Sequence, residues 1–369
     1  MGTPIAVIGV DIGWTKILAG AVDVRPGGFT DHLVAVEHRS TPRLAPPAFY
    51  DALADTVRRV QRRLARMGYA VPSVVAVAHP GRFRPDGTLA RATTPNLGTA
   101  PGQFDGRSPS RELSRRLGMR VIAENDAVAQ MRYGLDALLR DPAARPRLLG
   151  HTVVYLGPGT GMGGGVARVS RAGRVTPVTD GHFFDLQIPA WGDGRQTAEE
   201  LFTGPAIARA IARVNARLAA PIRPAKAESL DRLLQRDQTP SDPIHRAAER
   251  IADEQGAILA ALIETIRAGH IVKVRLEPLA GGRVRRHVDE PDHAWSAADQ
   301  ALVRGARRFI LGGSVGMSRG LGARIRYAAL ARLAARGLGR IEIVQIPVSS
   351  GNAGLLGVVR AVPLRGLTP

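Results

Sequence analysis

Residues 5–24, IAVIGVDIGWTKILAGAVDV, contain two apolar runs separated by a polar turn. The first run, Ile5 to Val10, is continuous, as in a strand that is buried on both faces. Asp11 and Gly13 follow it, and the second run begins at Ile17. Two strands that are joined by a short turn form a hairpin, and the backbone N–H groups of such a turn can approach an anion.

A second stretch repeats this arrangement. Thr152 to Leu156 is a predicted strand, the sequence GPGTGMGGG follows at 157–165, and Val166 to Val169 is the returning strand. The Pro-, Ala- and Arg-rich segment Asp141 to Arg147 between the two stretches is the predicted domain boundary. The repeat predicts an internally duplicated α/β architecture, and a chain of 369 residues is long enough for two domains.

Helices are predicted between and after these strands. Ala45 to Met67 carries apolar residues at helical spacing. In the second half we expect one helix from Thr197 to Leu218 and another from Ile244 to Ile266. A strand is expected at Phe309 to Leu311, and a helix at Ala353 to Val362 that joins the first domain.

The composition excludes several classes of protein. The formal net charge is +19, but lysine occurs only three times and scattered arginines supply the rest, so solvated helix faces are favoured over nucleic-acid binding. Cysteine is absent, which excludes disulfides and thiolate metal sites. The sequence shows no leader and no apolar run of membrane-spanning length. We therefore expect a cytoplasmic protein with neither a membrane nor a nucleic acid as partner.

Two of the turns have the composition of phosphate-binding loops. The first offers backbone N–H groups, the hydroxyl of Thr15 and the charge of Lys16, and Asp11 can hold Mg²⁺ through water. An ordinary hairpin with a surface Asp explains the same residues. In the second, glycines at this density let the backbone approach a ligand, and Thr160 can donate to a phosphate oxygen.

A third motif, Glu124-Asn125-Asp126, lies between a predicted strand and a predicted helix. A helix cap is the simple interpretation. The order in which this motif and others occur along the chain adds a catalytic interpretation. The set comprises the first turn with Asp11, Gly13, Thr15 and Lys16, Pro80-Gly81, Thr94-Pro95-Asn96-Leu97, Asn125-Asp126-Ala127, Gly159-Thr160-Gly161-Met162-Gly163-Gly164-Gly165, Gly181-His182, Glu199 with Thr203-Gly204, Leu311-Gly312-Gly313, and Ala353-Gly354-Leu355-Leu356-Gly357.

This ordered set, over nearly the whole chain, resembles the ROK family (repressors, open reading frames and sugar kinases) of the actin/hexokinase-like, RNase H-like duplicated fold. The resemblance implies domains at 1–140 and 148–352 and a role for each motif. Asp126 matches the base that accepts the proton of the attacking hydroxyl, an activity in keeping with phosphoryl transfer. The positions matching sugar contacts are Asn96, Asn125, His182 and Glu199. Those matching contacts to Mg²⁺, phosphate or adenosine are Asp11, Gly13, Thr15, Lys16, Gly159, Thr160, Gly161, Gly312 and Gly313.

Four departures from the family pattern stand out. Thr179 occupies the position of a usual Glu, with Asp180 beside it, so one contact to the acceptor is changed or lost. The structural zinc of the family uses the motif His and three cysteines, which this chain lacks, so we expect no zinc. Trp14 replaces a glycine. The segment 272–306 is an insertion with a basic tip, expected to be a surface hairpin.

The sequence therefore predicts an ATP- and Mg²⁺-dependent kinase that phosphorylates a hydroxyl of a sugar or of a sugar-like cyclitol, such as a C7-cyclitol in pseudosugar biosynthesis. The alternatives are a glucokinase-type hexose or N-acylhexosamine kinase, and a non-catalytic sugar sensor or regulator of the same family. We expect a homodimer, by likeness to the family.

Overall fold

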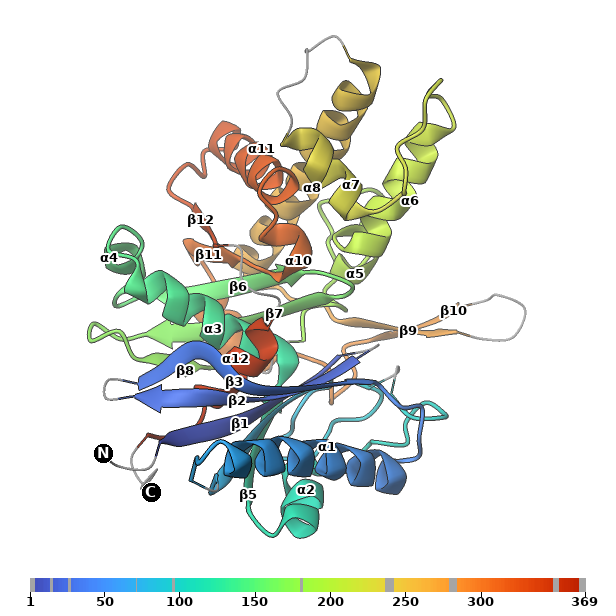
Figure 1. Cartoon of the computed structure of the whole chain (residues 1–369). Coiled ribbons are helices and arrows are strands. Elements are labelled where there is room, and N and C mark those ends of the chain that lie inside the picture. The colour runs from blue at the N-terminus through green and yellow to red at the C-terminus, as the bar shows by residue number, and fades with distance from the viewer. Residues whose placement is uncertain are drawn as a thin grey trace. The chain divides into compact units, whose positions relative to one another are not determined.

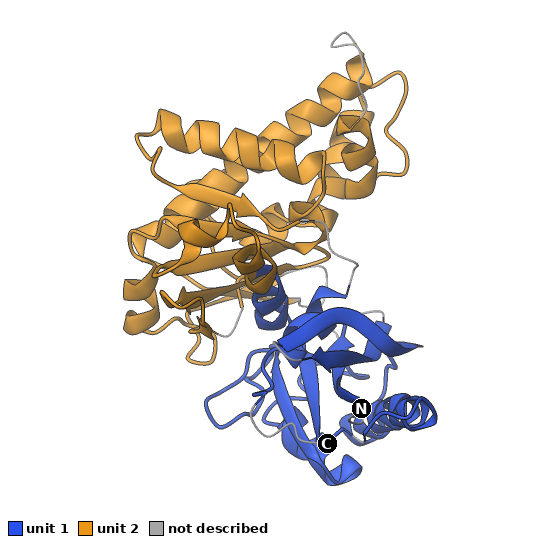
Figure 2. Ribbon diagram, turned by 60° about the vertical axis from the view of Figure 1, so that its left-hand side comes forward, with its two compact units in different colours: residues 1–134, 350–369 blue, residues 135–349 orange. Residues whose placement is uncertain are grey.

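The computed structural model describes residues 4–13, 16–25, 28–70, 72–94, 97–179, 182–235, 242–278, 284–347 and 352–364 (Figure 1). The chain divides into two compact units. Unit 1 comprises residues 1–134 and 350–369, and unit 2 comprises residues 135–349 (Figure 2). The division falls within helix α3 (Asp126–Arg140), before the segment 141–147 that the sequence indicates as the boundary.

Unit 1 is built on a five-stranded sheet of order β3-β2-β1-β4-β5. The strands are β1 (Ile5–Ile12), β2 (Lys16–Arg25), β3 (Gly28–Ser40), β4 (Val74–His79) and β5 (Arg120–Asn125). The first three pair antiparallel, whereas β4 and β5 run parallel to β1. The expected hairpin at residues 5–24 is therefore confirmed, and the carboxyl ends of β1, β4 and β5 lie at one edge of the sheet.

Helices cover both faces of this sheet. Helices α1 (Pro46–Arg66) and α2 (Pro109–Leu117) lie on one face, and α3 with α12 (Ala353–Val359) on the other (Figure 1). Phe49, Leu53 and Val57 of α1 are buried against the first face. Leu355 and Val359 of α12 are buried against the second. The C-terminal helix thus completes the core that the N-terminal strands begin.

Unit 2 repeats the topology. Its strands are β6 (Thr152–Pro158), β7 (Met162–Val169), β8 (Val175–Pro177), β11 (Arg308–Leu311) and β12 (Glu342–Gln345), in the order β12-β11-β6-β7-β8. Again the first three in sequence pair antiparallel, and the last two run parallel to β6. The two sheets therefore have the same strand order, which confirms the predicted duplication.

Eight helices and one hairpin complete the described part of unit 2. The helices are α4 (Arg145–Leu148), α5 (Ala198–Leu201), α6 (Gly204–Asn215), α7 (Ala227–Leu234), α8 (Pro243–Ala268), α9 (Ala297–Val303), α10 (Gly313–Gly316) and α11 (Leu321–Ala335). The hairpin consists of β9 (Val274–Pro278) and β10 (Val284–Val288). Asp242 caps α8 by accepting from the Ile244 N–H, and Gly269 ends it in the left-handed region at φ 69°.

The prediction of one helix from Thr197 to Leu218 is wrong, because the chain breaks between α5 and α6. Thr203 has an extended backbone, and its hydroxyl oxygen accepts from the Ala206 N–H, so it begins a new helix. The same hydroxyl donates to the Glu199 carbonyl at 3.0 Å. The prediction failed because the apolar residues keep their helical spacing across Thr203, where one helix has ended and the next begins.

Only glycine fits at position 357 of α12. A Cβ there would lie 1.7 Å from the carbonyl oxygen of Ala129 in α3. We expect Gly357→Ala to lower the free energy of unfolding by about 1–3 kcal/mol, because α12 must move away from α3 to remove the clash. Urea denaturation followed by circular dichroism measures this. The control is Gly339→Ala, at an exposed site with no heavy atom within 4 Å, and equal stability of the two variants would contradict the argument.

Candidate functional site

The carboxylate of Asp11 lies near the carboxyl end of β1, where its backbone pairs with Leu18 of β2 and Ala78 of β4. The first turn of α12 faces it closely, since a Cβ at Gly354 would lie 2.5 Å from Asp11 Oδ2. A glycine at 354 is therefore needed if the acid is to lie beside the start of the helix. Burial raises the pKa of Asp11 to about 6, although the charge of Lys16 opposes the increase.

Asp126 begins α3 at the same edge of the sheet, directly after β5. Its Oδ1 accepts from the Ala127 N–H at 2.8 Å. Burial, followed by the negative charge of Asp11, raises the pKa of Asp126 to about 7. A carboxylate with this pKa can accept a proton at neutral pH far better than an ordinary Asp. Unit 1 thus brings together the two acids that the sequence singles out.

Asn125 acts as a cap for α3. Its Oδ1 accepts from the N–H groups of Ala127 and Val128 at 2.9 and 3.3 Å, and its Nδ2 donates to the Gly81 carbonyl at 2.9 Å. Asn125 is therefore a helix cap, as the simple interpretation of the motif predicts. These bonds also fix the start of α3 and hence the backbone of Asp126. The second N–H of the amide is the atom with which Asn125 can reach a ligand.

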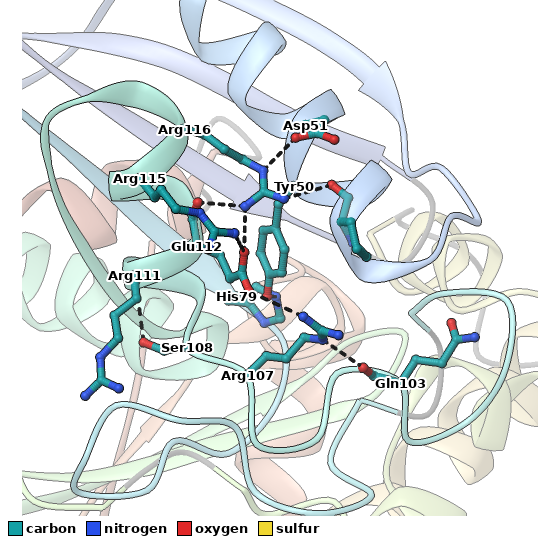
Figure 3. Close-up of polar contacts among 11 residues, drawn as sticks. Tyr50, Asp51, His79, Gln103, Arg107, Ser108, Arg111, Glu112, Arg115 and Arg116 are labelled. Atoms are coloured by element: carbon teal, nitrogen blue, oxygen red, sulfur yellow. Dashed lines mark hydrogen bonds and ion pairs between the residues drawn. The ribbon is translucent and has the colours of Figure 1, made fainter.

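The turn at Pro80-Gly81 is held from behind by His79, which is fully buried. Its Nδ1 contacts the Pro80 carbonyl at 2.5 Å, so this nitrogen carries the proton and Nε2 is left to accept from the Tyr50 hydroxyl at 3.5 Å. Burial lowers the pKa of His79 to about 4, and the ring is neutral. Figure 3 shows the surrounding polar contacts, in which Arg116 joins Asp51 of α1 to Glu112 of α2.

In unit 2 the glycine-rich turn between β6 and β7 lies directly against the turn at 312–313. The Gly159 N–H donates to the Gly161 carbonyl at 2.9 Å, which closes the loop. Gly313 has φ +67°, and a Cβ there would lie 2.3 Å from the Pro158 carbonyl oxygen. Gly312 lies as closely against the ring of Tyr155. The two motifs therefore pack against each other, with Gly312 and Gly313 buried and Thr160 exposed.

Glu199 and His182 lie beside the glycine-rich turn. Glu199 Oε2 accepts from the Met162 N–H at 2.6 Å, and burial raises the pKa of Glu199. His182 is buried and its backbone pairs with Gly163. The Met162 N–H is thus used by Glu199 and is not available to a phosphate. The expected glycine loop, His182 and Glu199 come together within unit 2.

Buried charges hold the segment that carries His182, a feature that the sequence did not reveal. Lys273, which is 1% exposed, forms an ion pair with Asp185 and donates to the His182 carbonyl. His293 Nδ1 lies 3.1 Å from the other oxygen of Asp185. Burial would raise the pKa of Asp185, but the Lys273 ammonium and the His293 hydrogen bond outweigh it and hold the pKa at about 2.

This network assigns a structural role to the base of the segment 272–306. The Val274 N–H donates to the Asp185 carbonyl at 2.7 Å, and the Gln187 N–H to the Val272 carbonyl at 2.9 Å. Lys273, His293 and Trp295 are buried, whereas most of β10 is exposed. The hairpin is therefore on the surface as expected of an insertion, but its base is part of the core beside His182.

Of the remaining residues that the sequence singles out, some are described by the structure and others lie outside the described part of the chain. Gly13 donates its N–H to the Lys16 carbonyl at 2.9 Å, and Lys16 is exposed at the start of β2. Thr179 uses its hydroxyl oxygen to accept from the Val166 N–H at 2.9 Å. Residues outside the described part of the chain are Trp14, Thr15, Asn96, Asp180 and Gly181.

Comparison of the whole chain with solved structures gives full-length matches. A ROK hexokinase from Thermus thermophilus matches with a TM-score of 0.56 and 23% identity, over 96% of each chain. A ROK family glucokinase from Streptomyces griseus, in complex with glucose and AMPPNP, matches with a TM-score of 0.58 and 18% identity, over 97% of this chain and 99% of that one. The chain has the fold of the ROK proteins. The predicted duplicated α/β fold is thereby confirmed.

The ROK fold also occurs outside enzymes. A ROK family transcriptional regulator, a homologue of the E. coli MLC protein, matches with a TM-score of 0.62 and 14% identity, over 96% of this chain and 76% of that one. No protein-family model matches this sequence, and no curated protein matches it either. Among the residues that the structure describes, no helix is long and apolar enough to cross a membrane.

Loss of Lys273 should leave the charge of Asp185 buried without its main partner. We expect Lys273→Met to lower the free energy of unfolding by about 3–5 kcal/mol at pH 7. Lys226→Met, at an exposed lysine, should change it by less than about 0.5 kcal/mol. Removing both charges in Lys273→Met/Asp185→Leu should recover most of the loss. Urea denaturation measures all three variants.

The pH dependence has a defined sign. The pKa of Asp185 in the folded protein, about 2, lies below its ordinary value of 3.8. The stability that this pair contributes is therefore complete above about pH 4 and is lost as the pH falls towards 2. The difference between the native protein and Lys273→Met should shrink over this range. A difference that is independent of pH would contradict the assignment.

Proposed function

We propose that this protein is an ATP-dependent kinase that transfers the γ-phosphoryl group to a hydroxyl of a sugar or a sugar-like cyclitol. The observation that carries the proposal is the pair Asp11 and Asp126 at one edge of the unit 1 sheet, where Asp126 has a pKa of about 7. One acid with raised proton affinity beside a second acid is what a kinase of this type needs, since phosphoryl transfer depends on positioning and on charge neutralisation.

In this proposal Asp126 accepts the proton of the attacking hydroxyl. The hydroxyl oxygen forms the new bond to the γ-phosphorus, the bond from that phosphorus to the bridging oxygen breaks, and ADP leaves. Asn125, Asn96, His182 and Glu199 would orient the acceptor. Gly13, Thr15, Lys16, Gly159, Thr160 and Gly161 would contact the phosphates, and Gly312 and Gly313 the adenosine. The partly exposed Gly159 and Gly161 and the exposed Thr160 support the phosphate contacts, because backbone without side chains allows close approach of a ligand.

Asp11 is the residue that would hold Mg²⁺, through water. A fit is supported by the charges of unit 1: burial raises the pKa of Asp126 most, the charge of Asp11 raises it further, and a cation beside Asp11 would offset that charge. The cation neutralises phosphate charge when it is bound. What this chain supplies is a carboxylate kept in position by the close contact with Gly354.

The proposal also specifies the chemical class of the acceptor. The hydroxyl of Thr179 is bound to the Val166 N–H and offers no charge, where a carboxylate would grip a sugar near its anomeric end. A charge-assisted hydrogen bond of about 1.5–3 kcal/mol is therefore replaced by a weaker one or by none. This favours a carbocyclic acceptor such as a C7-cyclitol. The alternative is a hexose or N-acylhexosamine kinase in which Asp180 supplies the carboxylate.

Asp126→Asn tests the base. The variant should bind acceptor nearly normally but turn over about 10²–10⁴ times more slowly, because an amide cannot take the proton. In the native enzyme kcat/KM should rise with pH up to about 7, or somewhat below it because Mg²⁺ beside Asp11 would lower the pKa of Asp126. That rise should be missing in the variant. Near-normal turnover of Asp126→Asn in an ATP-consumption assay would exclude Asp126 as the base, and binding without turnover in the native protein would favour a sugar sensor.

A comparison of acceptors tests the finer proposal. Values of kcat/KM should be measured for glucose, an N-acylated hexosamine and a C7-cyclitol such as a valiolone. We expect the cyclitol to be the best substrate, because the site at Thr179 lacks the charged contact to an anomeric hydroxyl. If glucose is preferred by a hundredfold or more, equivalent to about 2.7 kcal/mol, the cyclitol proposal is wrong and the hexokinase alternative holds.

A further inference from the structure

Lys273 is the buried residue through which the segment 272–306 contacts the stretch that carries His182. Its side chain has a relative exposure of 0%. The ammonium group donates to the His182 carbonyl and forms an ion pair with Asp185, three residues further along the chain. An ammonium group carries three N–H donors, so it can bond both of these oxygens at once. One side chain therefore holds this stretch of backbone at both ends.

The same lysine also contacts the ring beside His182. Its Nζ lies 6.0 Å from the centroid of the Phe184 ring, a distance at which a cation is attracted to the face of an aromatic ring. The Phe184 ring meets the imidazole of His182 edge to face, with ring centroids 5.0 Å apart and an interplanar angle of 66°. Lys273 thus restrains the backbone of His182 directly and the direction of its imidazole through Phe184.

Glu199 is held by the same stretch of chain. Its N–H donates to the Phe184 carbonyl at 2.9 Å, and the N–H of the preceding Ala198 donates to the Leu186 carbonyl at 2.7 Å. Leu186 in turn pairs with Lys273 in an isolated antiparallel bridge. The two candidate acceptor contacts of unit 2 therefore lie on backbone that is joined to this lysine.

We propose that Lys273 is a positioning residue for the acceptor, because it sets the relative position of His182 and Glu199. The inference rests on the proposed function, in which these two residues bind hydroxyls of the acceptor. Lys273 is buried and acts through them. Hydrogen bonds weaken steeply when their length and angle depart from the preferred geometry, and small displacements of positioning groups reduce catalysis strongly. Loss of the lysine should therefore weaken acceptor binding although both acceptor-binding side chains are intact.

The glycine-rich turn should be affected much less. The Gly159 N–H donates to the Gly161 carbonyl at 2.9 Å, and the Gly204 N–H donates to the Gly159 carbonyl at 2.8 Å. Neither bond involves the segment 272–306, and the proposed base Asp126 belongs to unit 1. The expected signature is a higher KM for the acceptor, with little change in kcat or in the KM for ATP.

The double variant Lys273→Met/Asp185→Leu separates positioning from stability. It removes both buried charges together, so its urea midpoint should be close to that of the native protein, but it leaves the His182 carbonyl without its donor. We expect the KM for glucose and for a C7-cyclitol such as a valiolone to rise at least tenfold, as should their Kd in calorimetric titration without nucleotide. Values of kcat and of the KM for ATP should stay within threefold of native.

Arg324→Met is the matched control, since it also replaces a cation of unit 2 by Met and breaks ion pairs, in this case with two acids of α8. It should leave both KM values unchanged. Phe184→Leu is a second, independent variant. It keeps both charges and removes the ring that lies between Lys273 and the imidazole, and it should raise the KM for the acceptor at least threefold.

The outcomes separate this inference from the kinase proposal. If the double variant is stable and binds acceptor as the native protein does, Lys273 is purely structural and the inference is wrong. It is equally wrong if kcat and both KM values deteriorate together. If the double variant does not fold, Phe184→Leu decides in its place, and an unchanged acceptor KM overturns the inference. If the native protein binds a polyol tenfold more tightly than the double variant but phosphorylates none, the positioning role stands and the kinase proposal fails. A native protein that neither binds nor phosphorylates these polyols overturns both.

Discussion

The first turn of α12 lies against the end of β1 and the start of α3 so closely that no Cβ fits at position 354 or 357. This approach places the carboxylate of Asp11 beside a helix start and beside the charge-sensitive Asp126. The close packing at Gly354 accompanies the burial that raises the pKa of both acids. It also brings the apolar side chains of α12 onto the sheet, where Leu355 and Val359 are fully buried. Packing and chemistry in unit 1 depend on the same contact.

In unit 2, buried charged side chains hold the backbone of a candidate site segment in place. Lys273, Asp185 and His293 lie almost out of contact with water and fasten the segment that carries His182. In the family that the sequence resembles, this segment contributes to a zinc site whose cysteines are missing here. An ion pair of this kind is costly to bury but even more costly to break, so it restrains the local backbone strongly. The segment 272–306 contributes two of its three members.

The sequence predicted the two sheets and the positions of most motifs because these depend on local patterns. Apolar runs ended by glycine give the hairpins at 5–24 and 152–169, and apolar spacing gives α1 within a residue at each end. It could not reveal the burial of Lys273, since that burial depends on Asp185 and His293, which are distant in the chain. Helical spacing also continued across Thr203, where a single side-chain cap divides α5 from α6. The dual use of Asn125, as helix cap and candidate ligand, became visible only from its hydrogen bonds.

The two segments of unit 1 are separated in the chain by all of unit 2. During synthesis the ribosome must therefore make some two hundred residues after the N-terminal sheet before α12 emerges. Until then one face of that sheet, with Val7, Leu18 and Val22, lacks its closing helix. Unit 2 is continuous and can fold as it is made, whereas unit 1 must wait with apolar surface exposed. Unit 1 therefore completes its core only after unit 2 has been made, although its strands come first in the sequence.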